Sequence, residues 1–326
     1  MWPARVFRKY FKQIYLVHTH KINLESKIEG HFFHLAIGNF DGIHLGHQQI
    51  INSLVKEAKE LNKPSAILSF HPHPRQFFSR ELDRYQIISD EKKQSIFADL
   101  GVNDYFCLKF DELLSNLSPI DFIKKIIIEQ LNVEKLIVGY DFRFGKDRKG
   151  DKNLLLECSK IYGFNIKIIE PINNIKTNKP YSSTAIREGI RKGKMDEVNL
   201  LLGRPWSMGG VVIHGDKRAR KMNFPTANIL PHDQIYPLKG VYTVNVKFEN
   251  NTIRGIANFG IRPTVSGEKL LLEVHLFDFN RDIYGNYLTV EFLAFIRGEK
   301  KFENFDYLIM QINKDIQIAK DYHKKK

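Results

Sequence analysis

Two histidines three residues apart stand at the start of an amphipathic stretch, where they could share one face of a helix. The segment 37–47 reads IGNFDGIHLGH and ends in His44 and His47 with two residues between them. It follows an apolar run at 31–38 and leads into 44–62, where apolar residues recur at helical spacing. Its glycines permit tight turns and close backbone approach. Two imidazoles beside the free N–H groups of a helix N-terminus form an anion site, which could hold phosphates and stabilise charge developing at phosphorus.

Other interpretations of this histidine pair have less support in the sequence. Histidines at this spacing are often only a surface feature. A zinc site is not indicated, because no third ligand follows at a recognisable spacing. The segment also lacks the GxGxxG pattern of a dinucleotide-binding fold.

A second polar segment, 214–228, reads HGDKRARKMNFPTAN and has the residue types of a phosphate-binding loop. A kinase needs donors for phosphates and oxygen ligands for Mg²⁺. The basic residues could supply the donors, and Thr226 and Asn228 the oxygens. Further along, Glu273 alternates with Leu272 and Val274, so its carboxylate lies on the other face of a strand. That carboxylate could be solvent-facing or a general base.

The elements around these segments divide the chain into two halves. Up to about residue 186, apolar runs alternate with helical patterns, which predicts a parallel, helix-flanked sheet. From about 204, short strands separated by Gly, Pro and Asn predict an antiparallel barrel with one closing helix near the end. A single helical stretch, 183–203, joins the halves and ends at Gly203.

Composition restricts the class of protein. A chain of 326 residues is long enough for about two domains, and 43% hydrophobic residues argue against disorder. No apolar run is long enough to cross a bilayer. Two cysteines, Cys107 and Cys158, suggest no disulfide framework, which fits a reducing cytosol. The net charge of +13 favours anionic partners, among them nucleotides, phosphates and nucleic acid.

The first half resembles the nucleotidylyltransferase superfamily. GNFDGIHLGH resembles its HxGH signature in the form found in bacterial FAD synthetases, and FHPHPR (70–75), GYDFRFG (139–145) and SSTAIR (182–187) are similar to three further family segments. The resemblance implies adenylyl transfer, with His44 and His47 catalytic. It implies ATP contacts from Gly38, Asn39, Phe40, Asp41, His44, His47, Ser183, Thr184 and Arg187, and flavin contacts from His73, Pro74, Asp141 and Phe142.

The second half resembles riboflavin kinases. FPTANI (224–229) resembles their signature, and PLKGVY (237–242) and ANFGIRPT (257–264) are similar to further family segments. The resemblance implies that Glu273 is the general base for the 5′-hydroxyl of riboflavin. It implies ATP contacts from Gly215, Lys217, Arg220, Thr226 and Asn228, flavin contacts from Arg262 and Glu273, and Mg²⁺ ligands in Thr226 and Asn228. Ala219 and Asn223 depart from the family pattern, since they stand where glycines are expected.

The sequence as a whole is thus identified as a member of the bacterial bifunctional riboflavin kinase/FAD synthetase family. We expect a Rossmann-like nucleotidyltransferase α/β domain at 1–186, a connecting helix at 187–203, and a six-stranded antiparallel barrel with a C-terminal helix at 204–326. ATP and Mg²⁺ would serve both sites, with riboflavin and FMN as small-molecule substrates. We expect a cytoplasmic protein with no nucleic-acid, membrane or obligate protein partner. A chain with a weak kinase site, or a basic regulatory or RNA-binding protein on this scaffold, stays an alternative.

Overall fold

The computed structural model describes residues 17–28, 33–79, 84–171, 173, 180–214, 224–231, 234–264 and 267–325. Side chains are described throughout these ranges except at 262–264 and 267–269. The described residues form two compact units. The first contains residues up to 86 together with 90–183, and the second contains 87–89 together with the residues from 184 onward.

The first unit is built on a parallel sheet. Its six strands lie in the order β1-β4-β3-β2-β5-β6, and each adjacent pair is parallel. The strands are β1 His18–Ile22, β2 Phe33–Ile37, β3 Ser65–His71, β4 Asp104–Lys109, β5 Val133–Gly139 and β6 Asn165–Ile169. The alternation of strand and helical patterns in the sequence therefore predicted this fold class correctly.

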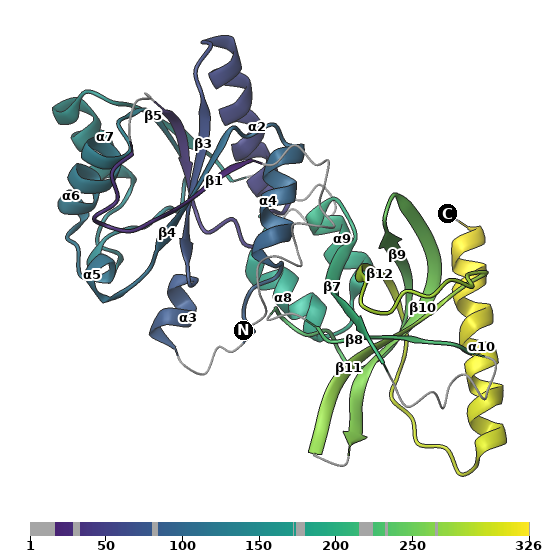
Figure 1. Cartoon of the computed structure of the whole chain (residues 1–326). Helices are drawn as coiled ribbons and strands as arrows, with labels where there is room; N and C mark the ends of the chain where they lie inside the picture. Colours follow the sequence, from purple (N-terminus) through teal and green to yellow (C-terminus); the bar gives the residue numbers. More distant parts are fainter. Residues whose placement is uncertain are drawn as a thin grey trace. The chain divides into compact units, whose positions relative to one another are not determined.

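Helices cover both faces of this sheet (Figure 1), as burial on both sides of parallel strands requires. The helical segments of this unit are α2 Leu45–Glu60, α3 Pro74–Phe78, α4 Asp90–Asp99, α5 Glu112–Ser115, α6 Pro119–Phe122, the π-helical η1 Ile123–Gln130, the short 3₁₀ turn η2 Lys146–Arg148 and α7 Lys152–Tyr162. Figure 1 shows α5, α6 and α7 on one face and α2 and α4 on the other. The expected helix at 120–131 is thus α6 followed by η1. The apolar side of η1 contributes Ile123, Ile126 and Ile127 to the core beneath the sheet.

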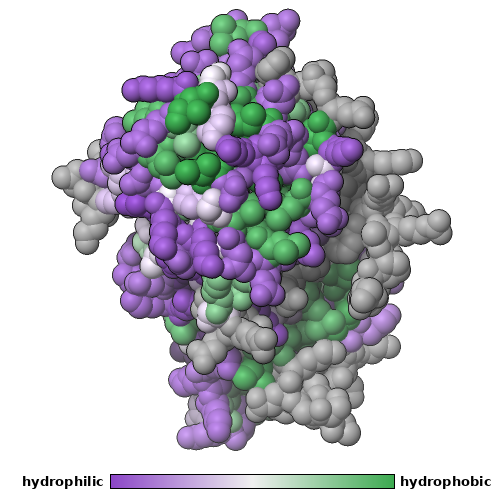
Figure 2. All heavy atoms as spheres, turned by 90° about the vertical axis from the view of Figure 1, so that its left-hand side faces the viewer, coloured by the Kyte–Doolittle hydropathy of each residue, from purple (hydrophilic) through white to green (hydrophobic). Residues whose placement is uncertain are grey.

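The surface formed by α5, α6 and α7 carries several exposed apolar side chains. Leu113, Ile120, Leu156 and Ile161 are all exposed. On the face that Figure 2 turns toward the viewer, apolar side chains lie in separate patches between hydrophilic ones. Scattered apolar residues of this kind are ordinary for a protein surface.

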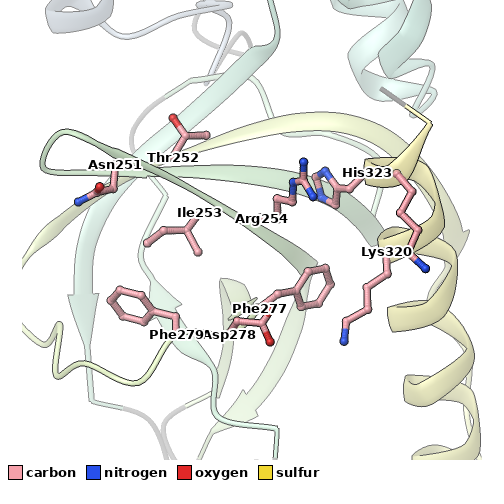
Figure 3. A pocket seen from close by; sticks show the side chains of 10 residues that line it. Asn251, Thr252, Ile253, Arg254, Phe277, Asp278, Phe279, Lys320 and His323 are labelled. Atoms are coloured by element: carbon pink, nitrogen blue, oxygen red, sulfur yellow. The ribbon is translucent and has the colours of Figure 1, made fainter.

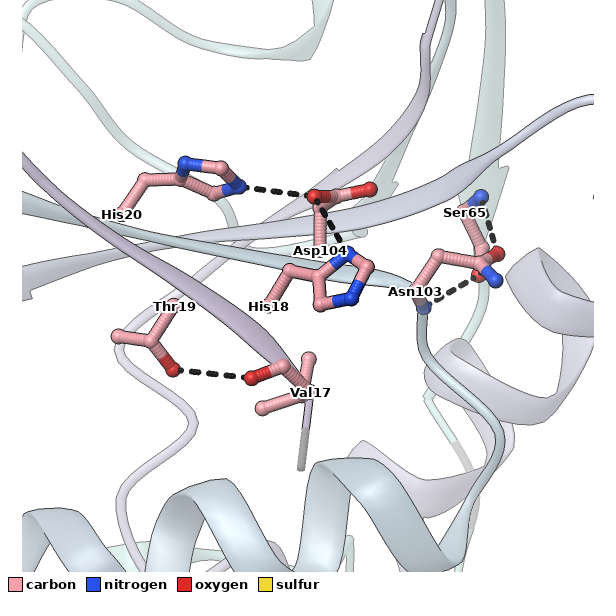
Figure 4. A network of polar contacts seen from close by, with 7 residues as sticks. All are labelled: Val17, His18, Thr19, His20, Ser65, Asn103 and Asp104. Carbon is pink, nitrogen blue, oxygen red and sulfur yellow. Dashed lines mark hydrogen bonds and ion pairs between the residues drawn. The ribbon is translucent and has the colours of Figure 1, made fainter. Parts of the chain in front are cut away.

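Polar side chains tie together the amino ends of the sheet strands (Figure 4). His20 Nε2 lies 2.8 Å from Asp104 Oδ1, which joins the edge strand β1 to β4. The side chain of Asn103 accepts hydrogen bonds from both the backbone and the hydroxyl of Ser65, at 2.9 and 2.8 Å. Near the same end, Glu57 of α2 accepts hydrogen bonds from Lys135 and Lys167. This edge of the sheet is held by paired groups.

The second unit contains a closed antiparallel barrel. Its strands follow the order β10-β11-β8-β7-β12-β9, and β9 pairs with β10 to close the ring. The strands are β7 Trp206–Ile213, β8 Ala227–Ile229, β9 Gly240–Phe248, β10 Asn251–Thr264, β11 Gly267–Leu276 and β12 Tyr287–Gly298. Along β11, Leu272, Val274 and Leu276 are buried inside the barrel. Glu273, which alternates with them along the strand, therefore faces outward, as the sequence predicted.

Three helices accompany the barrel. They are α8 Ser183–Arg191, α9 Met195–Leu202 and α10 Phe305–Lys324, the last of which packs beside β9 and β10 (Figure 1). The prediction of one helical stretch over 183–203 was wrong in one respect, because the chain breaks at Gly193, which has a φ of 70°. Glycine adopts this left-handed conformation without strain and ends α8. No helix in the described ranges has the length and apolar character needed to span a bilayer.

Candidate functional site

The carboxyl end of β2 is the meeting point of the predicted adenylyl-transfer segments. β2 lies between β3 and β5, so the loops after these three strands emerge side by side at one edge of the sheet. The first carries residues 38–44, the second carries 72–73, and the third carries 140–145. The strand order also reverses direction between β2 and β5. In open α/β sheets ligands bind at such a switch point.

His44 and His47 lie against each other at the start of α2. Their rings are stacked with centroids 3.6 Å apart. His44 is the N-cap of the helix, and its Nδ1 accepts a hydrogen bond from the backbone N–H of His47 at 3.2 Å. In a neutral imidazole an acceptor Nδ1 leaves the proton on Nε2. His44 can therefore donate to an anion through Nε2, next to the N-terminal N–H groups of α2.

The loop that precedes this helix is buried and held at several points. The N–H of Gly38 donates to the carbonyl of Leu68 on β3 at 3.1 Å, and Phe40 and Asp41 are buried. The hydroxyl of Ser183 donates to the carbonyl of Asp41 at 2.9 Å. This bond brings the predicted residue Ser183 to the loop of the HxGH segment, although 142 positions separate it from Asp41.

Gly46 sits where His44 approaches another aromatic residue, Tyr181. A Cβ at this position would lie 3.2 Å from both the His44 ring and Tyr181 Cβ. That spacing is tighter than ordinary van der Waals contact, so a larger residue would displace the His44 imidazole. The glycine in HxGH therefore keeps the first histidine in place.

The predicted flavin-contacting residues follow β3 and β5. His73 is buried and caps α3, with Nδ1 accepting from the N–H of Arg75 at 3.1 Å, and Pro74 is the first residue of that helix. Asp141 is exposed, and Phe142 is half-buried and stacks on Phe144 with centroids 5.6 Å apart. These residues share the sheet edge with the histidines, and their contact with a flavin stays a prediction.

Thr184 and Arg187 lie on α8, which belongs to the second unit from Thr184 onward. Arg187 is buried, with 5% of its surface exposed. A guanidinium is buried at this cost only where polar or charged groups compensate for the lost water. Their proposed contact with the triphosphate stays a prediction.

The second site forms across three neighbouring strands of the barrel. Glu273 on β11 is directly paired with Asn228 on β8 and with Asn258 on β10. Directly paired residues point to the same face, so these three side chains form one row. Asn228 is buried, and its Oδ1 makes no hydrogen bond to any residue that the structure describes. The row thus contains a carboxylate and an unused amide oxygen. Asn258 was not singled out from the sequence, because only the strand register reveals its place.

The segment that leads into β8 is anchored to β11. His275, two residues after Glu273, lies 2.9 Å through Nδ1 from the carbonyl of Pro225. This contact fixes the residue before Thr226, which is half-buried. The predicted residues Gly215, Lys217 and Arg220, and also Ala219 and Asn223, lie outside the described residues, as does the side chain of Arg262.

An open hollow of about 560 Å³ lies further along the same outer face (Figure 3). Arg254, Lys320, His323 and Lys324 give it a basic character, and Phe277 forms an apolar wall over which the Lys320 ammonium lies at 5.4 Å. Burial lowers the pKa of His323. None of the predicted kinase residues lines this hollow.

Comparisons with known proteins match both units of the chain. A family model for FAD synthetase matches residues 28–185, and one for riboflavin kinase matches 202–323. A bifunctional riboflavin kinase/FMN adenylyltransferase of Haemophilus influenzae is 41% identical over 88% of this chain and 93% of its own length. One from Buchnera aphidicola is 39% identical over 93% of this chain and 95% of its own.

The chain belongs to the bifunctional riboflavin kinase/FMN adenylyltransferase family. A solved structure is similar over most of the chain as well. It is described as a macrolide-efflux protein from Streptococcus pneumoniae, is 29% identical, covers 93% of this chain and 99% of its own, and has a TM-score of 0.83. The similarity therefore extends through both units.

Proposed function

We propose that this chain phosphorylates riboflavin to FMN in the barrel and adenylylates FMN to FAD in the parallel-sheet unit, using ATP for both reactions. The observation that carries the proposal is that relatives of this family match the chain over nearly their whole length. The stacked histidine pair of the first unit and the Asn228–Glu273–Asn258 row of the barrel support one reaction in each unit. The first unit, within the proposed domain 1–186, would be the FMN adenylyltransferase. The barrel, within 204–326, would be the riboflavin kinase.

In the adenylyl transfer, a phosphate oxygen of FMN attacks the α-phosphorus of ATP. The new P–O bond forms FAD, and the bond to the departing pyrophosphate breaks. Negative charge increases on the α-phosphate oxygens and on the leaving group as this happens. His44 Nε2, His47 and the N-terminal amides of α2 are the donors that would stabilise it. The flavin phosphate would approach from the loops after β3 and β5, which carry His73, Pro74, Asp141 and Phe142.

In the kinase reaction, the carboxylate of Glu273 accepts the proton of the 5′-hydroxyl of riboflavin. The hydroxyl oxygen attacks the γ-phosphorus of ATP, and ADP leaves. Glu273 occupies the middle of the row between Asn228 and Asn258, so its position relative to both is fixed by strand register. Lys217 and Arg220 are the proposed additional contacts to ATP, and Arg262 is the proposed additional contact to the flavin.

We propose Mg²⁺ as the metal of the barrel site. The buried Oδ1 of Asn228 has an unused acceptor position, and oxygen is the ligand type that Mg²⁺ prefers. In the described residues no group of three or more His, Cys, Asp or Glu side chains is arranged to hold a metal. Thr226 and Asn228 would therefore share the ion with substrate phosphates. When bound, the ion neutralises charge on the β- and γ-phosphate oxygens.

The proposed setting is the cytoplasm, where ATP is available, and we propose no nucleic-acid, membrane or obligate protein partner. Cys107 and Cys158 are both free thiols, as in a reducing compartment. The two free thiols support a cytoplasmic location.

Product analysis tests the proposed function. The full chain is incubated with riboflavin and Mg²⁺-ATP, and the flavins are separated over time. We expect FMN to appear first and FAD to follow, with ADP and pyrophosphate released in step. A chain that converts supplied FMN to FAD but never makes FMN would support the adenylyltransferase proposal and refute the kinase proposal. No flavin product from either substrate would refute the whole proposal.

A further inference from the structure

The loop that leads into the two histidines has an unusual backbone. Phe40 and Ile43 both have positive φ values, 46° and 41°, on either side of Gly42 at 83°. Bulky and β-branched residues rarely adopt this conformation, and such residues cluster where the surrounding structure holds a functional loop in place. The neighbours of this loop therefore matter to the site it forms.

One of these neighbours is a buried lysine on α4. Only 4% of the surface of Lys93 is exposed, and its Nζ donates to the carbonyl of Asn39 over a long 3.4 Å. Asp90, one turn earlier, is directed to His71, whose Nδ1 lies 3.3 Å away. Lys93 forms no salt bridge with any residue in the described part of the chain.

A buried ammonium group with a single long hydrogen bond is unfavourable in the free protein. Removing such a group from water is costly unless an opposite charge compensates for it. Within the described part of the unit no carboxylate fills that role, so a bound anion is the natural compensation. The loop beside Lys93 is the one proposed to meet the phosphates of ATP.

The peptide geometry gives the lysine a second effect on the loop. In a trans peptide the carbonyl and the following N–H point in opposite directions. Because the carbonyl of Asn39 is directed at Lys93, the N–H of Phe40 is directed away from it. Lys93 thus fixes the orientation of a peptide whose donor lies on the opposite side of the loop.

We propose that Lys93 is a positioning residue of the adenylyl-transfer site. It fixes the Asn39–Phe40 peptide and places a positive charge behind the loop, which favours the triphosphate of ATP on the loop's other side. This inference rests on the proposed FAD synthetase function of the first unit. Neither the histidine motif nor the other segments noted in the sequence contain Lys93.

Three substitutions separate the charge from the hydrogen bond. Lys93→Met removes both, Lys93→Gln keeps a donor for the Asn39 carbonyl but removes the charge, and Lys93→Arg keeps both. Lys56→Met is the control, since the Lys56 side chain is 76% exposed on α2 in the same unit. FAD formation from FMN is measured at varied ATP, inhibition by inorganic tripolyphosphate is measured in parallel, and thermal unfolding is followed for every variant.

We expect Lys93→Met and Lys93→Gln to lower kcat/KM for ATP by about 10- to 100-fold, as expected for a misplaced catalytic loop. Both should weaken tripolyphosphate inhibition, while KM for FMN changes little and Lys93→Arg restores most of the activity. Thermal stability should stay the same or increase, because an uncompensated buried charge has been removed. Lys56→Met should behave like the parent chain.

The inference is overturned if both neutral variants keep normal kcat/KM for ATP. It is also overturned if activity falls only in proportion to a loss of thermal stability, since Lys93 would then be a packing residue. Should Lys93→Met fail to fold, the comparison of Lys93→Gln with Lys93→Arg decides between charge and packing. A parent chain that makes no FAD at all would refute the proposed function before this question arises.

Discussion

The two candidate sites hold their reactive groups in different ways. At the carboxyl edge of the parallel sheet, His44 is oriented by capping its own helix, and the preceding loop has two non-glycine residues at positive φ. In the barrel, Asn228, Glu273 and Asn258 are aligned by the register of three antiparallel strands. The site at the start of α2 relies on hydrogen-bond donors at the N-terminus of a helix, which suit a developing negative charge. The row of Asn228, Glu273 and Asn258 in the barrel instead provides a general base and an oxygen ligand at a spacing fixed by the strands.

The largest effect on activity should come from replacing Glu273, the middle residue of the row in the barrel. Glu273→Gln removes the general base but keeps the shape, so FMN formation should fall by roughly 10²–10⁴-fold. Conversion of supplied FMN to FAD should be unchanged, because it takes place in the other unit. Glu249→Gln, an exposed carboxylate at the start of the β9–β10 turn, is the matched control. Full kinase activity in Glu273→Gln would make Glu273 an ordinary surface carboxylate.

Replacing the helix-capping histidine should affect the other reaction. We expect His44→Ala, and separately His47→Ala, to lower FAD formation by about 10²–10³-fold, the usual cost of losing one preorganised donor. FMN formation from riboflavin should persist in the same samples. The exposed His18 serves as the control for a histidine-to-alanine change in this unit. If FAD formation continues at a near-normal rate in both variants, the histidines do not stabilise the reaction and are surface groups.

The amino edge of the parallel sheet should show an effect on stability rather than on activity. Burial alone would raise the pKa of Glu57, but hydrogen bonds and charges from Lys135 and Lys167 outweigh it and lower this pKa from 4.5 to about 2. The unfolded carboxyl titrates near its ordinary value, so the stabilisation is complete above pH 4.5 and disappears as the pH falls through about 2.

Glu57→Gln should therefore reduce the free energy of unfolding by about 1–3 kcal/mol at pH 7. The difference from the parent chain should shrink between pH 4.5 and 2, as measured by denaturant unfolding at each pH. Glu60→Gln, an exposed position on the same helix, should change little. A difference that stays constant down to pH 2 would show that charge pairing is not its source.

The smallest effect on activity is expected from substitutions in the polar segment 214–228 of the proposed kinase. Asn tolerates left-handed backbone angles, and a forced left-handed Ala costs only about 1–2 kcal/mol. The double variant Ala219→Gly and Asn223→Gly should thus change kinase kcat/KM by no more than about tenfold. FMN production at saturating Mg²⁺-ATP provides the measurement. A gain of several orders of magnitude would identify the natural loop as defective and the chain as chiefly an FAD synthetase.

The fold class followed from sequence patterns because both halves have clear periodicity. Alternating strands and helices indicated the parallel sheet, and the outward direction of Glu273 followed from the apolar residues beside it. The edge strand β1 was missed, since HTHKI (18–22) is short and polar and pairs with the distant β4. β8 was missed as a strand because it is only three residues long, Ala227–Ile229 at the end of the FPTANI segment.

Apart from the family resemblance, spacing in the sequence indicated the site only where its residues lie close together. His44 and His47 share a helix turn, which spacing alone reveals. The bond between Ser183 and Asp41 and the row containing Asn258 depend on tertiary contacts between segments far apart in the chain. Lys93 gave no signal, since a lysine in a helix rich in charged residues is normally solvent-exposed, and its burial depends on how α4 packs.

The short strand β8 also has a consequence for how the barrel opens. It pairs with β11 at three positions and with β7 at two, fewer than the neighbouring pairs have. Local opening tends to begin where few backbone hydrogen bonds hold an element. The amide hydrogens of β8, which carries Asn228, should therefore exchange sooner than those of the long β9–β12 pair. A nucleotide and a metal bound at Asn228 would hold β8 to its neighbours and slow amide exchange there. Substrate binding would thus reduce local opening of the barrel.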